Sequence, residues 1–238
     1  MSSPAFAKRP SALNRNARHR PGRTLSILAC ALISCGLVGC SLLGGGGNDR
    51  ARSTIYAPDP RVQVDPSWPS AQWQLSLAPP TSARMIDSLR IAVRPTPDEM
   101  QVYSGAAWSK PPTEMLQDTI LRALEDSGKL AAVARQGTGF AADYKLALDV
   151  RRFEADYAAG VIPAATIEVN AKLIHARDQG IVASHTFLHA EPASSAEIPQ
   201  VVEAFSRSLE AVGGDISGWV LATGGAHERD AHPQIQTP

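Results

Sequence analysis

The sequence predicts an α+β fold, in which a mixed β-sheet carries two amphipathic helices packed on one face as an α/β two-layer sandwich. Several segments after residue 72 alternate apolar and polar residues, which is the period of half-buried strands. Two longer segments repeat apolar residues at intervals of three and four, which is the helical period. The predicted order is three strands, a helix, four strands and a second helix.

The first strands are expected at 72–77, at 88–94 and, as a short strand, at 100–103. Pro79-Pro80 follows the first of them, and proline cannot continue a central strand. The second segment, SLRIAVR, puts its aliphatic residues at alternate positions, so we expect one of its faces to be buried.

The first helix is expected to begin at Pro111-Pro112-Thr113, with Thr113 as its N-cap, and to end at Ser127-Gly128. A short strand at 130–134 and the loop 135–140 follow it. Apolar residues at helical spacing form the expected buried stripe of this helix: Leu116, Ile120, Leu121 and Leu124.

The remaining strands are expected at 144–153, 166–175 and 181–190, and the turn 177–180 joins the last two as a β-hairpin. Ser194 and Glu197 resemble a capping box that opens the second helix. Within this helix, Gly213-Gly214 is a candidate kink. Its apolar stripe is the strongest periodic signal in the chain: Val201, Phe205, Leu209, Val212, Ile216 and Val220.

Composition divides the chain into four parts. Residues 1–39 read as a signal peptide, 40–71 as a flexible Gly- and Pro-rich linker, 72–223 as the folded domain and 224–238 as a disordered tail. Residues 1–39 hold six basic residues and no acidic one, so the rest of the chain is acidic. An acidic domain lacks the basic face of nucleic-acid-binding proteins, so we expect no nucleic-acid partner.

The N-terminal segment resembles the signal of bacterial lipoproteins. A basic stretch precedes the apolar run 24–39, which ends in Leu37-Val38-Gly39-Cys40, a lipobox-like sequence. The resemblance implies cleavage between Gly39 and Cys40 and a lipid on the Cys40 thiol, with palmitate among its acyl chains. Ser41 in place of an aspartate implies the outer membrane. The alternative is an uncut transmembrane helix over 24–43.

Few residues of the domain suggest chemistry. All three cysteines lie between positions 30 and 40, so the domain has no disulfide or cysteine metal site. His185 and His189 share a strand face with Phe187, but no nearby cysteine or carboxylate completes a metal set, so ordinary strand histidines are the preferred reading.

Three carboxylates, Glu154, Asp156 and Glu168, are expected to be solvated surface groups. We therefore predict no catalytic, metal or cofactor site. Tyr103 and Trp108 are candidates for a partner interface, and the competing interpretation is that Trp108 caps the core beneath the first helix.

The region 72–221 resembles the ABC-type transport auxiliary lipoproteins, which include the lipoprotein partners of MCE-domain lipid transport systems. The resemblance rests on the aromatic segment 102–108, on LEDSGKLAAV at 124–133, on the Phe187 strand and on Trp219-Val220. The family's N-terminal aromatic residue corresponds to either Tyr56 or Trp73.

This resemblance implies a non-enzymatic periplasmic component that works beside an MCE-domain protein, an ABC permease and its ATPase. It also implies that the cargo is phospholipid or another hydrophobic compound, and it makes a homo-oligomer a reasonable expectation. Two alternatives from other classes are a lipoprotein of another envelope machine, such as outer-membrane biogenesis or a Tol-like assembly, and a periplasmic enzyme.

Overall fold

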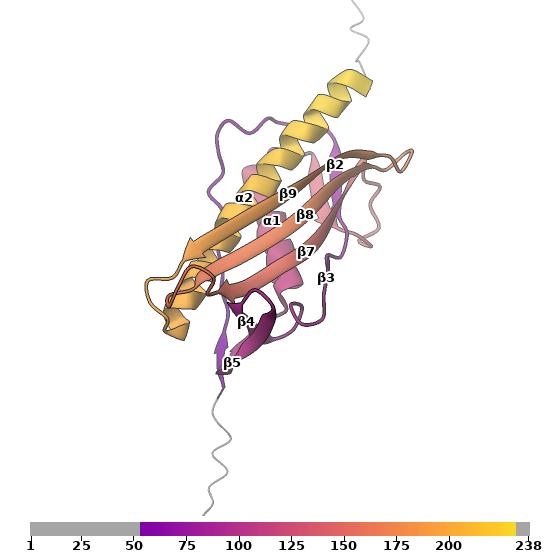
Figure 1. The fold of residues 1–238 in the computed structure, drawn as a ribbon. Coiled ribbons are helices and arrows are strands. Elements are labelled where there is room, and N and C mark those ends of the chain that lie inside the picture. Colours follow the sequence, from indigo (N-terminus) through magenta and orange to yellow (C-terminus); the bar gives the residue numbers. More distant parts are fainter. Residues whose placement is uncertain (1–52, 232–238) are drawn as a thin grey trace, which may run out of the picture. The chain divides into compact units, whose positions relative to one another are not determined.

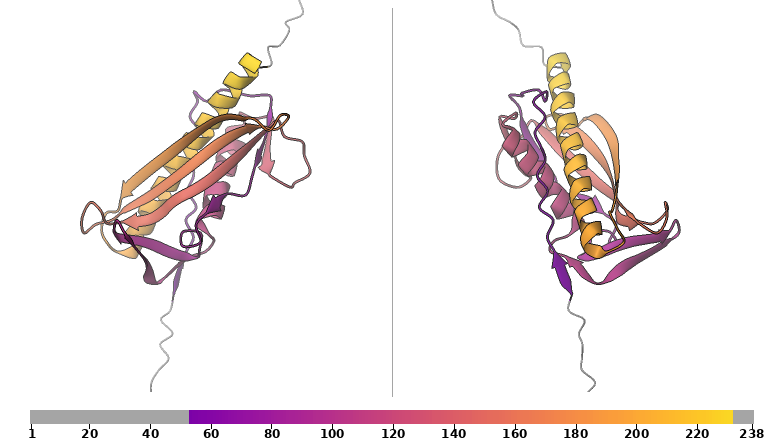
Figure 2. Two further views of the ribbon diagram at one scale, coloured as in Figure 1. Left: turned by 45° about the vertical axis from the view of Figure 1, so that its right-hand side comes forward. Right: turned by 90° about the vertical axis from the view of Figure 1, so that its left-hand side faces the viewer.

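The computed structural model describes residues 53–231, which form a mixed β-sheet and two helices (Figure 1). Helix α1 spans Pro112–Ser127 and helix α2 spans Ile198–Ala231. Both helices lie against the same face of the sheet, as the side views show (Figure 2). The predicted α+β fold, with two helices on one face of a mixed sheet, is confirmed.

The sheet contains every predicted strand and two further short ones. Strand β5 is much longer than the segment 100–103 predicted for it, and β1 and β3 were not predicted because they are too short to show alternation. The strands are β1 (Thr54–Tyr56), β2 (Gln74–Leu77), β3 (Thr81–Ser82), β4 (Arg90–Thr96), β5 (Glu99–Trp108), β6 (Ala132–Arg135), β7 (Tyr144–Asp156), β8 (Ala164–His175) and β9 (Ile181–Pro192).

Strand β7 is the centre of the sheet. Along one edge it pairs antiparallel with β8, which forms the predicted hairpin with β9. Along its other edge it pairs in parallel with β2, β3 and β4 in succession. The outer strands then follow, with β6 beside β2, β5 beside β4 and β1 beside β5.

The core lies between this sheet and the helices. Its central contact is aromatic: Phe153 of β7 stacks on Phe205 of α2 with ring centroids 4.9 Å apart. Trp108, at the end of β5, meets both rings edge-on at 6.0 and 5.2 Å. Edge-to-face pairs of this kind add to the stabilisation that comes from burying their apolar surface.

Both predicted helix caps are wrong. Pro111 occupies the cap position of α1, and Thr113 lies inside the helix, where its N–H and hydroxyl donate to the Asp87 carboxylate at 3.3 and 2.7 Å. Before α2, the Ser195 hydroxyl accepts a hydrogen bond from the Glu197 N–H at 3.2 Å, and the predicted cap Ser194 makes no such bond. A carboxylate from a distant turn can take over the role of a local cap.

The predicted kink at Gly213-Gly214 is absent from α2, and the glycines of this helix serve close packing instead. Helix α2 stays helical through both glycines and on to Ala231. A Cβ on Gly213 would lie 2.7 Å from Cγ2 of Thr119 in α1, and a Cβ on Gly218 would lie 2.7 Å from Nε1 of Trp68. These glycines therefore let neighbouring elements approach the helix axis.

Two predicted domain boundaries are also wrong. The expected linker 40–71 includes β1, and Trp68, in the same stretch, packs against the core. The expected tail 224–238 continues α2 as far as Ala231, and the rest of it lies outside the described residues. Proline and glycine suggested flexible chain, but here packing against the domain outweighs their low intrinsic propensity.

The glycine packing on α2 can be tested by substitution. In Gly224→Ala the new Cβ would overlap Cζ2 of the buried Trp73 ring, so we expect the free energy of unfolding to fall by about 1–3 kcal/mol. Gly225→Ala is the matched control, because its Cβ would meet only Nη1 of Arg229 at 3.6 Å. Urea unfolding of both variants measures the difference, and equal effects would show that the close approach is unimportant.

Candidate functional site

The predicted lipidation site lies outside the described residues. Gly39, Cys40 and the alternative membrane helix at 24–43 all precede residue 53, where the description begins. Between residues 53 and 231 the structure has no helix that combines the length and the apolar character needed to cross a bilayer.

The two candidate interface aromatics have different environments. Trp108 is 1% exposed in the core, so the prediction that it anchors a partner is wrong for the domain as folded, and the core interpretation holds. Tyr103 is partly buried, and its hydroxyl hydrogen-bonds the hydroxyl of Tyr157 at 2.9 Å. Burial and this partner raise the pKa of Tyr103, so it acts as a neutral hydrogen-bonding group.

A polar hollow of about 720 Å³ opens at one end of the sheet, between the chain that leads into β2, the end of β8 and the last turns of α2. The Tyr144 hydroxyl lies between two helix residues, donating to Oε1 of Glu228 at 2.7 Å and meeting Nδ1 of His227 at 2.7 Å. Because a hydroxyl has one proton, this arrangement requires Nδ1 of His227 to be the donor. Burial, followed by the Glu228 carboxylate, raises the pKa of Tyr144.

His175 completes this cluster. It is buried, its Nδ1 lies 3.0 Å from Oδ1 of Asp178, and its ring centroid lies 5.2 Å from that of His227. The Gly180 backbone N–H, followed by His175, lowers the pKa of Asp178. Sequence reasoning missed this cluster because His227 and Glu228 were assigned to a disordered tail.

The other histidines that the sequence singled out are kept apart from the cluster. Nε2 of His189 lies 2.8 Å from Oδ2 of Asp215 on α2, while His185 packs edge-on against Phe187 with centroids 4.6 Å apart. In the part of the chain that the structure describes, no three His, Cys, Asp or Glu side chains are grouped to hold a metal ion. The arrangement is suited to hydrogen bonding and packing.

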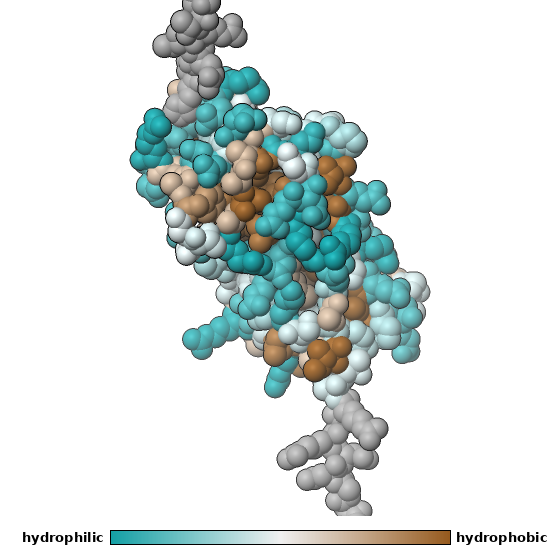
Figure 3. All heavy atoms as spheres, turned by 180° about the vertical axis from the view of Figure 1, so that it is seen from behind, coloured by the Kyte–Doolittle hydropathy of each residue, from teal (hydrophilic) through white to brown (hydrophobic). Residues whose placement is uncertain are grey.

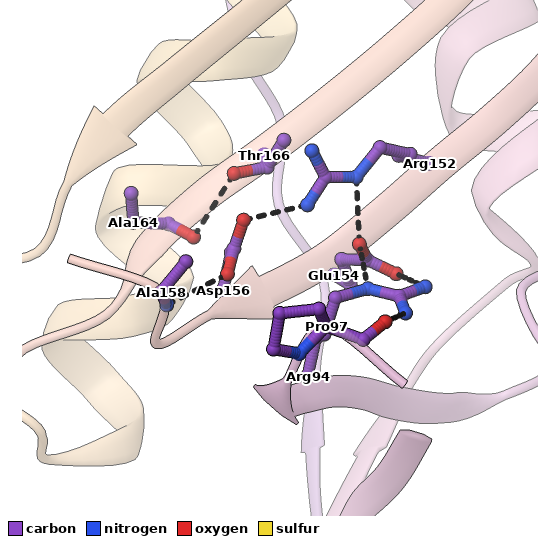
Figure 4. A network of polar contacts seen from close by, with 8 residues as sticks. All are labelled: Arg94, Pro97, Arg152, Glu154, Asp156, Ala158, Ala164 and Thr166. Carbon is purple, nitrogen blue, oxygen red and sulfur yellow. Dashed lines mark hydrogen bonds and ion pairs between the residues drawn. The ribbon is translucent and has the colours of Figure 1, made fainter. Parts of the chain in front are cut away.

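A second polar cluster lies at the opposite end of β7 (Figure 4). Glu154 is 0% exposed, and its carboxylate accepts hydrogen bonds from Arg94 at 2.6 and 3.0 Å and from Arg152 at 2.7 Å. Arg152 also donates to Asp156 at 2.6 Å. The prediction that Glu154 is a solvated surface group is therefore wrong.

A bulge brings these charges together. The register of β7 shifts between Val150 and Arg152, which puts Phe153 into the core. Its two neighbours, Arg152 and Glu154, therefore lie on the other face of the sheet. The bond to Glu154 raises the pKa of Arg94. Burial opposes ionisation of Asp156, but the Ala158 N–H and Arg152 outweigh it and lower the pKa of this carboxyl.

Comparisons with known proteins find relatives of the whole domain. A family model described as ABC-type transport auxiliary lipoprotein component matches residues 54–217. The crystal structure of protein XCC0632 from Xanthomonas campestris is 55% identical, covers 74% of this chain and 99% of its own, and superposes with a TM-score of 0.72.

A second crystal structure, of an uncharacterized protein, is 12% identical, covers 69% of this chain and 96% of its own, and has a TM-score of 0.56, which shows a shared fold. A search of curated proteins found no match.

The ion network gives a stability prediction. Glu154→Gln removes the carboxylate charge that pairs with both arginines, so we expect the free energy of unfolding to fall by about 2–4 kcal/mol. The loss is smaller than for a pair with both partners buried, because both arginines are partly exposed. Glu168→Gln is the control: its partner Arg151 lies 3.6 Å away at the surface, so about 1 kcal/mol or less should be lost. Chemical denaturation compares them, and similar losses would contradict a structural role for Glu154.

Proposed function

The chain belongs to the family of ABC-type transport auxiliary lipoprotein components, and from this membership we propose that it serves an MCE-type lipid transport system as a docking subunit. The proposal rests on the extent of the family match. The matched residues, 54–217, include the entire sheet, α1 and more than half of α2. Family membership implies association with the cell envelope and with an ABC transport system.

The lipid anchor is the first part of the proposal. Cys40 carries the lipid after cleavage behind Gly39, and the mature protein is held on the periplasmic side of the outer membrane. The lipobox-like sequence and Ser41 support this location. Two or more acyl chains hold a protein stably on a membrane, because each buried CH₂ contributes about 0.8 kcal/mol.

A non-enzymatic role is the second part. The Tyr144 hydroxyl of β7 hydrogen-bonds both His227 and Glu228 near the end of α2. This bonding supports a role in holding the helix end against the sheet. The function is then binding and positioning of other subunits: the MCE-domain protein, the permease and, through the permease, the cytoplasmic ATPase.

The polar hollow is the surface that we propose for docking. It lies where β7 begins, and Arg177 and Arg229 on its rim can pair with carboxylates of a partner. Strand β1 runs antiparallel to β7, because β1 is parallel to β5, β5 is antiparallel to β4, and β4 is parallel to β7. The anchored chain therefore enters at the end remote from the hollow, which leaves the hollow accessible to a partner deeper in the periplasm.

The anchor is tested by Cys40→Ala. We expect this variant to appear in the soluble periplasmic fraction or to accumulate as the uncut precursor, whereas the unmutated protein sediments with the outer membrane. Fractionation with immunoblotting of both forms measures this. An unchanged, mature-sized, membrane-bound Cys40→Ala protein would contradict lipid anchoring and favour the uncut helix over 24–43.

The partners are tested by mild crosslinking in cells followed by purification of the chain and mass spectrometry. We expect an MCE-domain protein and an ABC permease among the captured proteins, and we expect Cys40→Ala to capture less of both because it is no longer held at the membrane. A clean capture that contains neither component would count against the MCE assignment while leaving family membership intact.

A further inference from the structure

The turn that joins β7 to β8 is an exposed apolar tip. Residues 158–162 read AAGVI and contain no charged or hydrogen-bonding side chain. Val161 is 85% exposed and Ile162 is 46% exposed, so the two largest side chains of the tip face solvent. Large apolar side chains at a protruding turn are unfavourable in water and suggest contact with another apolar phase.

The tip is rigid at its base. The Ala158 N–H donates to Oδ1 of Asp156 at 2.9 Å, and the Gly160 N–H donates to the Tyr157 carbonyl at 3.0 Å. Gly160 has a φ of +142°, a conformation that glycine adopts most easily. Two backbone donors are thus satisfied within the turn, which lowers the cost of removing the tip from water.

The buried ion network fixes this base in place. Asp156, which accepts from the tip, is itself held by Arg152, and Arg152 is held by Glu154. On the other side, the hydroxyl of Tyr157 bonds that of Tyr103 in β5. The tip therefore projects from a well-ordered part of the sheet.

The tip lies at the end of the domain that the anchored chain enters. Because β1 runs antiparallel to β7, it begins at the end where β7 finishes and the tip starts. Figures 1 and 2 show β1 and the β7–β8 turn in the lower half of the domain, away from the end of α2. Seen from the helical side, a small apolar group lies at this lower end, and a larger apolar area lies in the upper half (Figure 3).

The length of the connecting chain allows the tip to reach the membrane. Thr54 is fourteen residues after Cys40. A segment of this length spans at most about 50 Å, even when fully extended. A lipid on Cys40 would therefore keep the start of β1 within about 50 Å of the bilayer surface.

The size of the tip favours lipid over protein. A stable protein interface buries about 800 Å² on each partner, which is much more than five small residues provide. A membrane contact can be smaller, because an existing anchor keeps the tip at a high local concentration beside the bilayer. The adjoining turn carries Asp98 and Glu99, so a zwitterionic surface suits this end better than an anionic one.

We propose that the 158–162 tip rests on a zwitterionic phospholipid surface and orients the anchored domain on the membrane. This inference rests on the lipid anchor at Cys40 proposed above. The contact is shallow, with Val161 and Ile162 at the boundary between the headgroups and the acyl chains, because the unpaired backbone groups of a turn cannot enter the hydrocarbon core.

The test uses the mature, lipidated full chain with a single added cysteine. Val161→Cys labels the tip, and Arg177→Cys labels the exposed turn between β8 and β9 as a matched control, about 40 Å away along the hairpin. Each variant carries an environment-sensitive dye and is reconstituted into phosphatidylcholine vesicles that contain lipids with a quencher near the headgroup. We expect several-fold stronger quenching at position 161 than at position 177.

The outcomes separate the two proposals. Equal quenching at both positions in protein that floats with the vesicles overturns the tip contact and leaves the anchor standing. Disulfide-linked dimers through unlabelled Val161→Cys, in preference to Arg177→Cys, overturn it in favour of a second copy as the occupant. Failure of the unmutated lipoprotein to float refutes the anchor, and the tip contact that depends on it falls as well.

Discussion

The backbone of β7 forms hydrogen-bonded ladders along both of its edges, and the other parts of the sheet are joined through it. The β8–β9 hairpin attaches to one edge, and β2, β3 and β4 attach in turn to the other. Isolated hairpins and strand pairs of this size are marginally stable in water. Pairing along β7 makes them one sheet, large enough to cover the two helices.

The bulge in β7 links this architecture to the two ends of the domain. Before the bulge, Tyr144 and Val150 face the helices, and after it Phe153 takes over that role. The shift leaves Glu154 on the opposite face, buried among arginine side chains that neutralise it. One strand therefore supports a polar cluster at its start and an ion network with an apolar tip at its end.

Helix α2 depends on glycine in a way that helix propensity alone would discourage. Its glycines cost conformational entropy, but they allow Thr119, Trp68 and Trp73 to pack against the helix itself. At its end, the Tyr144 hydroxyl bonds His227 and Glu228 and ties the last turns to the sheet. The chain thus uses the long helix α2 as part of its core.

By itself, the sequence determined the fold class, the β8–β9 hairpin, the presence and apolar stripes of both helices and the family, because long periodic segments and the 102–108 and 124–133 motifs are local signals. Only the tertiary structure decided which residues are buried or packed by partners from distant parts of the chain. It buried Glu154 and Trp108, ordered the chain from Thr54 and extended α2 through Gly224. The physical reason is that burial, ion pairing and close packing depend on partners far away in the chain, which no local pattern specifies.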